Sequence, residues 1–268
     1  MKLSEQYLQR FGGIGRLYGS EALPLLHDSH FIVIGVGGVG SWAAEALARS
    51  GVGAITLIDL DDVCITNTNR QSHALQPTIG RQKVAVLAER LRQINPEIRV
   101  REEEDFLAQD NLAELIDPDT GPVDVVIDAI DSARVKAALV AYCKARKLRL
   151  VTVGSAGGKR DPQRIEWNDL GRTVNDPMLA KVRQHLYRFH NFQKSSKRVF
   201  GVDAIFSPEQ MVYPQPDGQV CGRKSAMQDG VKLDCSGGFG AATMVTGTFG
   251  FVAASRGIER LLQAKLSR

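Results

Sequence analysis

Short apolar runs separated by helix-like stretches fill the first 158 residues of the chain. Residues 31–35 (FIVIG) and 54–59 (AITLID) are predicted to be buried strands, and the alanine and leucine spacing of SWAAEALARSG between them predicts a helix that closes at Gly51. A strand, a glycine-rich turn, a helix and a second strand form a βαβ unit, whose parallel strands lie in a sheet covered on both faces. We therefore expect a doubly wound α/β fold.

The same alternation continues along the chain. Residues 81–96 (RQKVAVLAERLRQINP) predict an amphipathic helix stopped by an Asn-Pro pair, and residues 98–106 predict an exposed strand. A buried strand ending in acids, a helix, and a strand running into a glycine loop follow at 123–131, 132–147 and 148–158. Together these elements predict a mostly parallel, Rossmann-like sheet.

Residues 236–255 carry no charged side chain and match the ~20 residues that cross a bilayer. Five glycines, few large aliphatic side chains and the lack of a second such stretch favour a buried helix of the core instead. We expect this helix to return to the sheet, and we expect no membrane partner.

Charge is unevenly distributed. The 268 residues carry a net charge of +4, yet residues 159–200 alone hold ten basic and four acidic side chains, so the remainder is net negative. Prolines and glycines in residues 207–238 predict an irregular crossover loop able to cover a site. The sequence thus predicts three parts: a core at 1–158, an appended basic segment and loop at 159–238, and a C-terminal helix at 239–268.

The four cysteines lie far apart without a CxxC pair, so neither a disulfide framework nor a tetrahedral zinc site is predicted. The residues at the N-terminus lack the apolar run of a secretory signal. We therefore expect a reducing, cytoplasmic location.

Candidate chemistry begins at the first glycine-rich turn. Gly35, Gly37 and Gly40 give GxGxxG between a predicted strand and a predicted helix, where backbone N–H groups and the helix dipole can hold a phosphate. Asp59 ends the second strand, where a carboxylate accepts hydrogen bonds from ribose hydroxyls. Tight packing of the helix on the strand is the structural alternative for the glycines, and an NAD enzyme would show the same features.

A polar cluster just beyond the second strand separates these alternatives. The sequence DLDDVCITNTNRQ contains amides, acids and one arginine that a dehydrogenase does not need, and an arginine beside phosphates suggests a triphosphate. The residues of this cluster are Asp59, Asp61, Asn67, Asn69, Arg70 and Gln71.

The motif GxGGVGSWxAExLARSGVGxxxLxDxDxV, followed by NxNRQ, GRQK and DAID, resembles the superfamily of ubiquitin-activating enzymes and their bacterial molybdopterin- and thiamin-pathway relatives, the ThiF type. The resemblance implies ATP and Mg²⁺. By it, the backbone of Gly37, Gly38 and Gly40 surrounds the phosphates and Asp59 holds the ribose. It further implies that Asn67, Arg70 and Lys83 reach the phosphates, that Asp131 holds Mg²⁺, and that Asp128 lies behind it.

Residues 154–188 (GSAGGKRDPQRIEWNDLGRTVNDPMLAKVRQHLYR) resemble the branch of that superfamily that dehydrates threonylcarbamoyladenosine in tRNA. This implies adenylation of the threonine carboxylate, attack by the neighbouring carbamoyl oxygen, and release of AMP. The basic segment would then bind tRNA phosphates near the anticodon loop. Tyr187, Phe189, His190 and Phe192 could stack on an unpaired base, or Leu186, Phe189 and Phe192 could pack inward as one face of a helix.

Partners follow from the same resemblance. It implies a homodimer in which Arg10 or Arg16 of one subunit enters the partner's ATP site, and Cys235 could accept sulfur from a cysteine desulfurase or SufE-like partner, or be a small buried apolar residue. The alternatives are an adenylating activator of a ubiquitin-like sulfur carrier, a non-catalytic nucleotide-binding scaffold for sulfur transfer, and an NAD oxidoreductase. The missing zinc cysteines count against the first, and Arg70, Lys83 and Asp131 against the other two.

Overall fold

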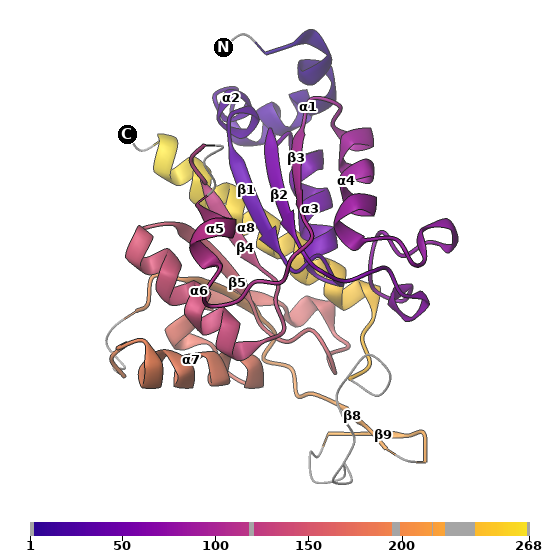
Figure 1. Ribbon diagram of the computed structural model, residues 1–268, viewed down its shortest axis with the longest axis vertical. Coiled ribbons are helices and arrows are strands. Elements are labelled where there is room, and N and C mark those ends of the chain that lie inside the picture. The colour runs from indigo at the N-terminus through magenta and orange to yellow at the C-terminus, as the bar shows by residue number, and fades with distance from the viewer. Residues whose placement is uncertain (1–2, 118–120, 195–198, 216, 223–238, 267–268) are drawn as a thin grey trace.

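A seven-stranded sheet forms the centre of the protein (Figure 1). The computed structural model describes residues 3–117, 121–194, 199–215, 217–222 and 239–266. The strand order is β3-β2-β1-β4-β5-β7-β6, and all neighbours are parallel except the edge strand β6, which runs antiparallel to β7. The strands are β1 (His30–Ile34), β2 (Ala54–Ile58), β3 (Arg99–Glu103), β4 (Val125–Asp128), β5 (Arg149–Val153), β6 (Glu166–Asp169) and β7 (Asp203–Phe206).

Helices cover both faces of this sheet. They are α1 (Glu5–Tyr18), α2 (Ala22–His27), α3 (Gly40–Arg49), α4 (Lys83–Ile94), α5 (Leu112–Ile116), α6 (Ala133–Arg146), α7 (Pro177–Phe189) and α8 (Thr243–Leu266). Short 3₁₀ turns lie at Ile65–Asn67, Gln76–Thr78, Pro162–Arg164 and Leu170–Arg172, and a small hairpin is formed by β8 (Tyr213–Pro214) and β9 (Val220–Cys221). The predicted doubly wound, mostly parallel fold is confirmed.

Alternate side chains of the central strands enter two separate hydrophobic cores. Phe31 and Val33 of β1 pack with α3, α4 and α8, whereas Ile32 and Ile34 pack with α5, α6 and α7. Burial of both faces explains why these strands consist of continuous apolar runs rather than alternating ones. The described part of the uncharged stretch lies largely in α8, where Phe249 is fully buried, so the predicted core helix is confirmed there. Among the described helices, none has the length and apolar character that a membrane crossing requires.

The middle segment contributes more to this framework than its sequence suggests. β6 and β7, from within residues 159–238, extend the sheet beyond β5, and α7 packs against α6. Neither strand was predicted, because β6 faces solvent at its first two residues and β7 is only four residues long. The charged segment therefore lies partly within the core fold, and only its loops and exposed faces remain for a partner.

The two ends of the strands carry different elements. α1 sits at the amino ends, where the Tyr7 hydroxyl donates to the carbonyl of Gly51 at 2.6 Å. The carboxyl ends lie at the opposite end, where the loops after β1, β2, β4 and β5 converge (Figure 1). Chain order reverses there between β1 and β4, and crevices at such reversals are where doubly wound proteins bind ligands.

Candidate functional site

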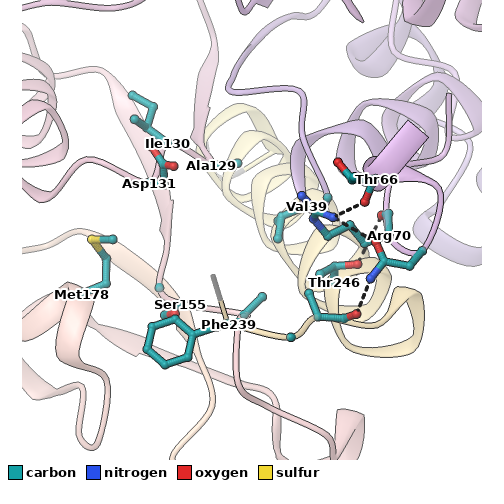
Figure 2. Close-up of a pocket in the computed structure, with 17 residues that line it drawn as sticks. Val39, Thr66, Arg70, Ala129, Ile130, Asp131, Ser155, Met178, Phe239 and Thr246 are labelled. Atoms are coloured by element: carbon teal, nitrogen blue, oxygen red, sulfur yellow. Dashed lines mark hydrogen bonds between the residues drawn. The ribbon is translucent and has the colours of Figure 1, made fainter. Parts of the chain in front are cut away.

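A cavity of about 440 Å³ lies at this reversal point. Its walls come from the loops that follow β1, β2, β4 and β5 and from the start of α8. Figure 2 shows Arg70 and Thr246 on one wall, Asp131 and Met178 on the opposite wall, and Phe239 with Ser155 between them. Of the residues predicted to form the site, Gly38, Asn69, Arg70 and Asp131 line this cavity.

The glycines of the first turn have two separate roles. Gly35 has a positive φ of 78°, and a Cβ on Gly40 would stand 1.9 Å from the carbonyl oxygen of Gly35, so these two glycines allow α3 to approach β1. Gly38 lines the cavity, and a Cβ there would lie 3.2 Å from Cγ of Arg70. Gly35 and Gly40 thus serve the packing of α3 on β1, whereas Gly38 borders the cavity.

The start of α3 faces this turn without a side-chain cap, since Val39 occupies the N-cap position. The first N–H groups of a helix have no partner within the helix, although in α3 that of Ser41 already donates to the carbonyl of Gly37 at 3.1 Å. With the positive end of the helix dipole they favour a bound anion such as a phosphate.

Arg70 is held in place by its own loop and by the start of α8. Its Nη1 donates to the carbonyl of Thr66 and to Oδ1 of Asn69, both at 2.9 Å. Asn69 in turn donates to the carbonyl of Ala241 at 2.8 Å, and Thr246 donates to the carbonyl of Arg70 at 3.3 Å (Figure 2). A guanidinium fixed in this way keeps further N–H donors for an anion in the cavity.

Asp131 is the one carboxylate among the described residues that line the cavity, and it is exposed. No group of three or more metal-ligating side chains occurs in the described ranges. Mg²⁺ in nucleotide sites is held by one or two carboxylates together with phosphates and water, so a single free carboxylate facing Arg70 across the cavity suits that ion.

Lys83, Asp59 and Asp61 form an ion cluster beside the cavity rather than in its wall. Nζ of Lys83 donates to Asp61 at 2.6 Å and lies 3.8 Å from Asp59. Asp59 also accepts a hydrogen bond from the backbone of Val36 at 2.8 Å, which ties the end of β2 to the glycine turn. Burial raises the pKa of Asp59, and the ammonium of Lys83 opposes that rise.

Behind the turn lie buried polar atoms without a hydrogen-bond partner among the described residues. They belong to Gln71, Ser72 and His73. Burial, reinforced by Lys83 and Arg90, lowers the pKa of His73 to about 4, so its ring is neutral near pH 7. Orphaned buried groups of this kind point to bound water or ligand. Asn67 is buried too, but its side chain accepts from the backbone of Cys64 at 3.0 Å and so shapes the loop.

Asp128 does not line the cavity. It is fully buried at the end of β4, where Nζ of Lys136 lies 2.8 Å from one of its oxygens and Thr152 donates to the other at 2.6 Å. Lys136 was missed from the sequence because a helix lysine normally faces solvent. Its spacing from Leu139, Val140 and Cys143 places it on the buried face of α6 and was the available signal.

The remaining walls were not predicted. Residues 154–157 after β5 line the cavity, and a Cβ on Gly154 would stand 2.2 Å from Asp176. Asp176 caps the start of α7 and accepts from the backbone of Ser155, so it joins this loop to Met178 on α7. The glycines of GSAGG were the only signal for this wall.

The described basic side chains of residues 159–200 fall into two groups, those that bind within the fold and those that are exposed. Lys159 is buried and donates to the carbonyls of Ser207 and Glu209, and Arg183 donates to Leu170 and Thr173. These two cations serve the fold. The exposed cations of the described part are Arg160, Arg164, Arg172, Lys181, Arg188 and Lys194.

Arg10 and Arg16 lie exposed on α1, at the amino ends of the strands and so at the end opposite their own cavity. Cys235, Lys197 and Arg198 lie outside the described residues.

Comparison with known proteins gives consistent results. The sequence model of the ThiF family matches residues 13–265 of this chain. The tRNA threonylcarbamoyladenosine dehydratase of Escherichia coli (strain K12) is 54% identical over 266 residues, which cover 99% of this chain and 98% of the relative. Structures of the E. coli enzyme, TcdA, in complex with ATP and with AMP have TM-scores of 0.88 and 0.87, at 50% and 51% identity, with full coverage of both chains.

Proposed function

The chain belongs to the ThiF family, and from that premise we propose that it uses ATP to dehydrate N6-threonylcarbamoyladenosine in tRNA to a cyclic form. The observation that carries the proposal is the extent of the similarity to the E. coli dehydratase, which runs through nearly the whole chain and therefore includes the segment after residue 158. The cavity at the reversal point, with a cation and an acid on facing walls, supplies the groups that adenylation requires.

ATP binds in this cavity in the proposal. Its phosphates lie against the turn at Gly37 and Gly38 and the uncapped start of α3, while Asp59 accepts from the ribose. Arg70 neutralises charge that builds on the departing pyrophosphate, and it does so from a preformed position because Thr66 and Asn69 already hold it. Lys83 reaches the phosphates by exchanging Asp61, which is 72% exposed, for a phosphate oxygen.

Asp131 holds Mg²⁺ in this proposal, and the ion would neutralise the phosphates when bound. Asp128 supports it from behind through the short loop of Ala129 and Ile130, because the backbone N–H of Ile130 donates to Asp128 at 3.1 Å. Among the described residues the cavity wall contains no cysteine, serine–histidine pair or other activated nucleophile.

A protein nucleophile is not needed for the second step. The carboxylate oxygen attacks the α-phosphorus and pyrophosphate leaves. The neighbouring carbamoyl oxygen then attacks the acyl carbon, the bond from that carbon to AMP breaks, and the carbamoyl N–H releases its proton to solvent. Because nucleophile and acyl group belong to the same nucleoside, the enzyme's contribution is to hold them in line and exclude water.

The exposed cations of the middle segment bind tRNA phosphates near the modified nucleotide, and such binding weakens steeply with salt. We further propose a cytoplasmic enzyme, a homodimer in which Arg10 or Arg16 completes the partner's site, and a cysteine desulfurase or SufE-like partner that donates sulfur to Cys235. The ATP-binding core at 1–158, the tRNA-binding segment at 159–238 and the returning helix at 239–268 remain the proposed division of roles.

The experiment measures AMP release with ATP, magnesium and threonylcarbamoylated tRNA. The wild-type protein should release AMP with this tRNA and not with tRNA that lacks the modification. Asp131→Asn should lower turnover at least ~100-fold, with a thermal midpoint within a few degrees of wild type, because the side chain is exposed. Glu114→Gln, an exposed acid on α5, is the matched control and should keep full activity.

Two results would contradict the proposal. AMP release that requires a small ubiquitin-like carrier protein in place of tRNA would identify the rival activator. Tight ATP binding without AMP release under either condition would identify a scaffold.

A further inference from the structure

A second cavity, of about 460 Å³, lies at the α6–α7 pair, and Gln109, Arg134, His185, Phe189 and His190 line it. α6 and α7 pack side by side on one face of the sheet (Figure 1). The cavity is of the size and mainly apolar character that small aromatic groups prefer. No step proposed above uses it.

Two helices, α6 and α7, connect this second cavity to the neighbourhood of the ATP cavity. Arg134 lies in the first turn of α6, three residues beyond Asp131. On α7, Met178 lines the first cavity and His185 lines the second, two helical turns later, a rise of about 10 Å. A polymer whose reacting group enters the first cavity could therefore place a neighbouring unit in the second.

The aromatic side chains at the end of α7 and just beyond it differ in whether they are packed or exposed. Tyr187 and Phe192 pack edge-to-face on Phe200, with centroids 6.0 and 5.2 Å apart, and Leu186 is fully buried. Phe189 does not join them and is 59% exposed. The inward-packing alternative from the sequence thus holds for Leu186 and Phe192 but not for Phe189.

Neighbours fix the ring of Phe189 although much of it faces solvent. His185 stacks on it at 5.6 Å with an interplanar angle of 26°, and the guanidinium of Arg188 lies 5.1 Å from its centroid. An aromatic ring that its neighbours hold in place, and that is still 59% exposed, suits stacking on a nucleobase, because little side-chain entropy remains to be lost.

Polar groups suited to a base edge surround the ring. Nδ1 of His185 is buried without a hydrogen-bond partner among the described residues. The amide of Gln109 and the ring of His190 offer a donor and an acceptor each. Arg134, with Arg188 and Lys181 on α7, supplies exposed positive charge for the phosphates on either side of a base.

We propose that this second cavity binds an unpaired nucleobase of the RNA substrate, stacked on Phe189, next to the nucleotide that reacts in the ATP cavity. The inference rests on the proposed function, since it needs an RNA substrate. It assigns Phe189 to holding the RNA in register.

The test combines Phe189 variants with RNA that lacks single bases. A threonylcarbamoylated anticodon stem-loop is prepared with an abasic site at each loop position in turn, and its dissociation constant is measured by fluorescence anisotropy. At one loop position, removal of the base should weaken binding to the wild-type protein about tenfold. The same abasic RNA should bind Phe189→Ala nearly as well as the intact RNA does, because the variant has already lost the ring on which that base stacks. Phe189→Tyr, which keeps the ring, should bind the intact RNA as wild type does.

Salt dependence separates stacking from charge. Phe189→Ala should keep the wild-type slope of binding against salt, whereas Lys181→Ala should lower that slope by about one. Additive losses at every abasic position, or wild-type affinity in Phe189→Ala, would overturn the inference. If the wild-type protein dehydrates the tRNA but the Phe189 variant and the abasic positions act independently, only the base pocket is wrong. If the protein releases no AMP with that tRNA, the proposed function is wrong.

Discussion

Asp128 and Asp131 lie three residues apart at the end of β4 and meet opposite surroundings. Asp131 is exposed in the cavity, whereas Asp128 and Lys136 are both fully buried and paired. The sequence suggested that both acids belong to the site. Their difference arises because β5 brings Thr152 and α6 brings Lys136 to Asp128, and these tertiary contacts are not visible in a sequence motif.

Lys136→Met should destabilise the fold. It leaves the carboxylate of Asp128 buried and uncompensated, which costs about 3–5 kcal/mol of unfolding free energy. Adding Asp128→Asn should recover part of that loss, since no buried charge then remains. Urea denaturation of the single and double variants measures both values. A Lys136→Met protein with wild-type stability would show that the pair is not a structural ion pair.

At the scale of elements, the β1–α3 turn explains why the GxGxxG pattern was informative. Gly40→Ala should destabilise the protein by about 1–3 kcal/mol or more, because its methyl group would overlap the carbonyl of Gly35. Gly38→Ala meets only the flexible side chain of Arg70 and the methyl of Thr246, so it should fold normally and weaken ATP binding. Thermal unfolding and calorimetric ATP titration distinguish the two; equal loss of stability in both would contradict the division of roles.

β7 and α8 are joined by one acid and two arginines. Asp203 accepts from Arg256 at 2.8 Å and from Arg260 at 2.5 Å, and Arg256 also stacks on Trp167 of β6. Burial would raise the pKa of Asp203, but the hydrogen bonds from the two arginines outweigh it and hold that pKa below its usual value.

Asp203→Asn should therefore lower stability in a pH-dependent way. At neutral pH the loss should be about 2 kcal/mol, less than for a fully buried pair because Arg260 is 40% exposed. The ionised carboxylate stabilises the fold only above its lowered pKa, so the difference between wild type and variant should shrink as the pH falls below about 4. A difference that stays constant down to pH 2 would exclude this ion pair as its origin.

For the whole molecule, the first 158 residues could be predicted well because each strand and helix there has its own apolar pattern. β6, β7 and the cap at Asp176 could not, since they are short or polar and form only by pairing with distant strands. The lining of the cavity was predictable where a motif fixes its residues, as for Arg70. It was not predictable where walls come from distant loops, as for Phe239.

The position of α1 gives a prediction about the proposed dimer. Arg10 and Arg16 lie at the end of the molecule opposite their own cavity, so either can act only in a partner. Co-expressed Arg70→Ala and Arg16→Ala chains, or Arg70→Ala and Arg10→Ala chains, should form mixed dimers with one intact site. For the arginine that acts, activity should reach about a quarter of wild type, although each homodimer is inactive. No recovery with either pair would contradict an arginine supplied in trans.

The central claim is that the substrate carboxylate is joined to AMP before the ring closes, and labelling its oxygens tests this most directly. Threonylcarbamoylated tRNA with ¹⁸O in the threonine carboxylate is incubated with ATP and magnesium, and the AMP and the tRNA nucleosides are analysed by mass spectrometry. The expected result is AMP that carries one ¹⁸O together with a nucleoside that has lost one labelled oxygen as its ring closed. Unlabelled AMP, or a nucleoside that retains both labelled oxygens, would contradict it.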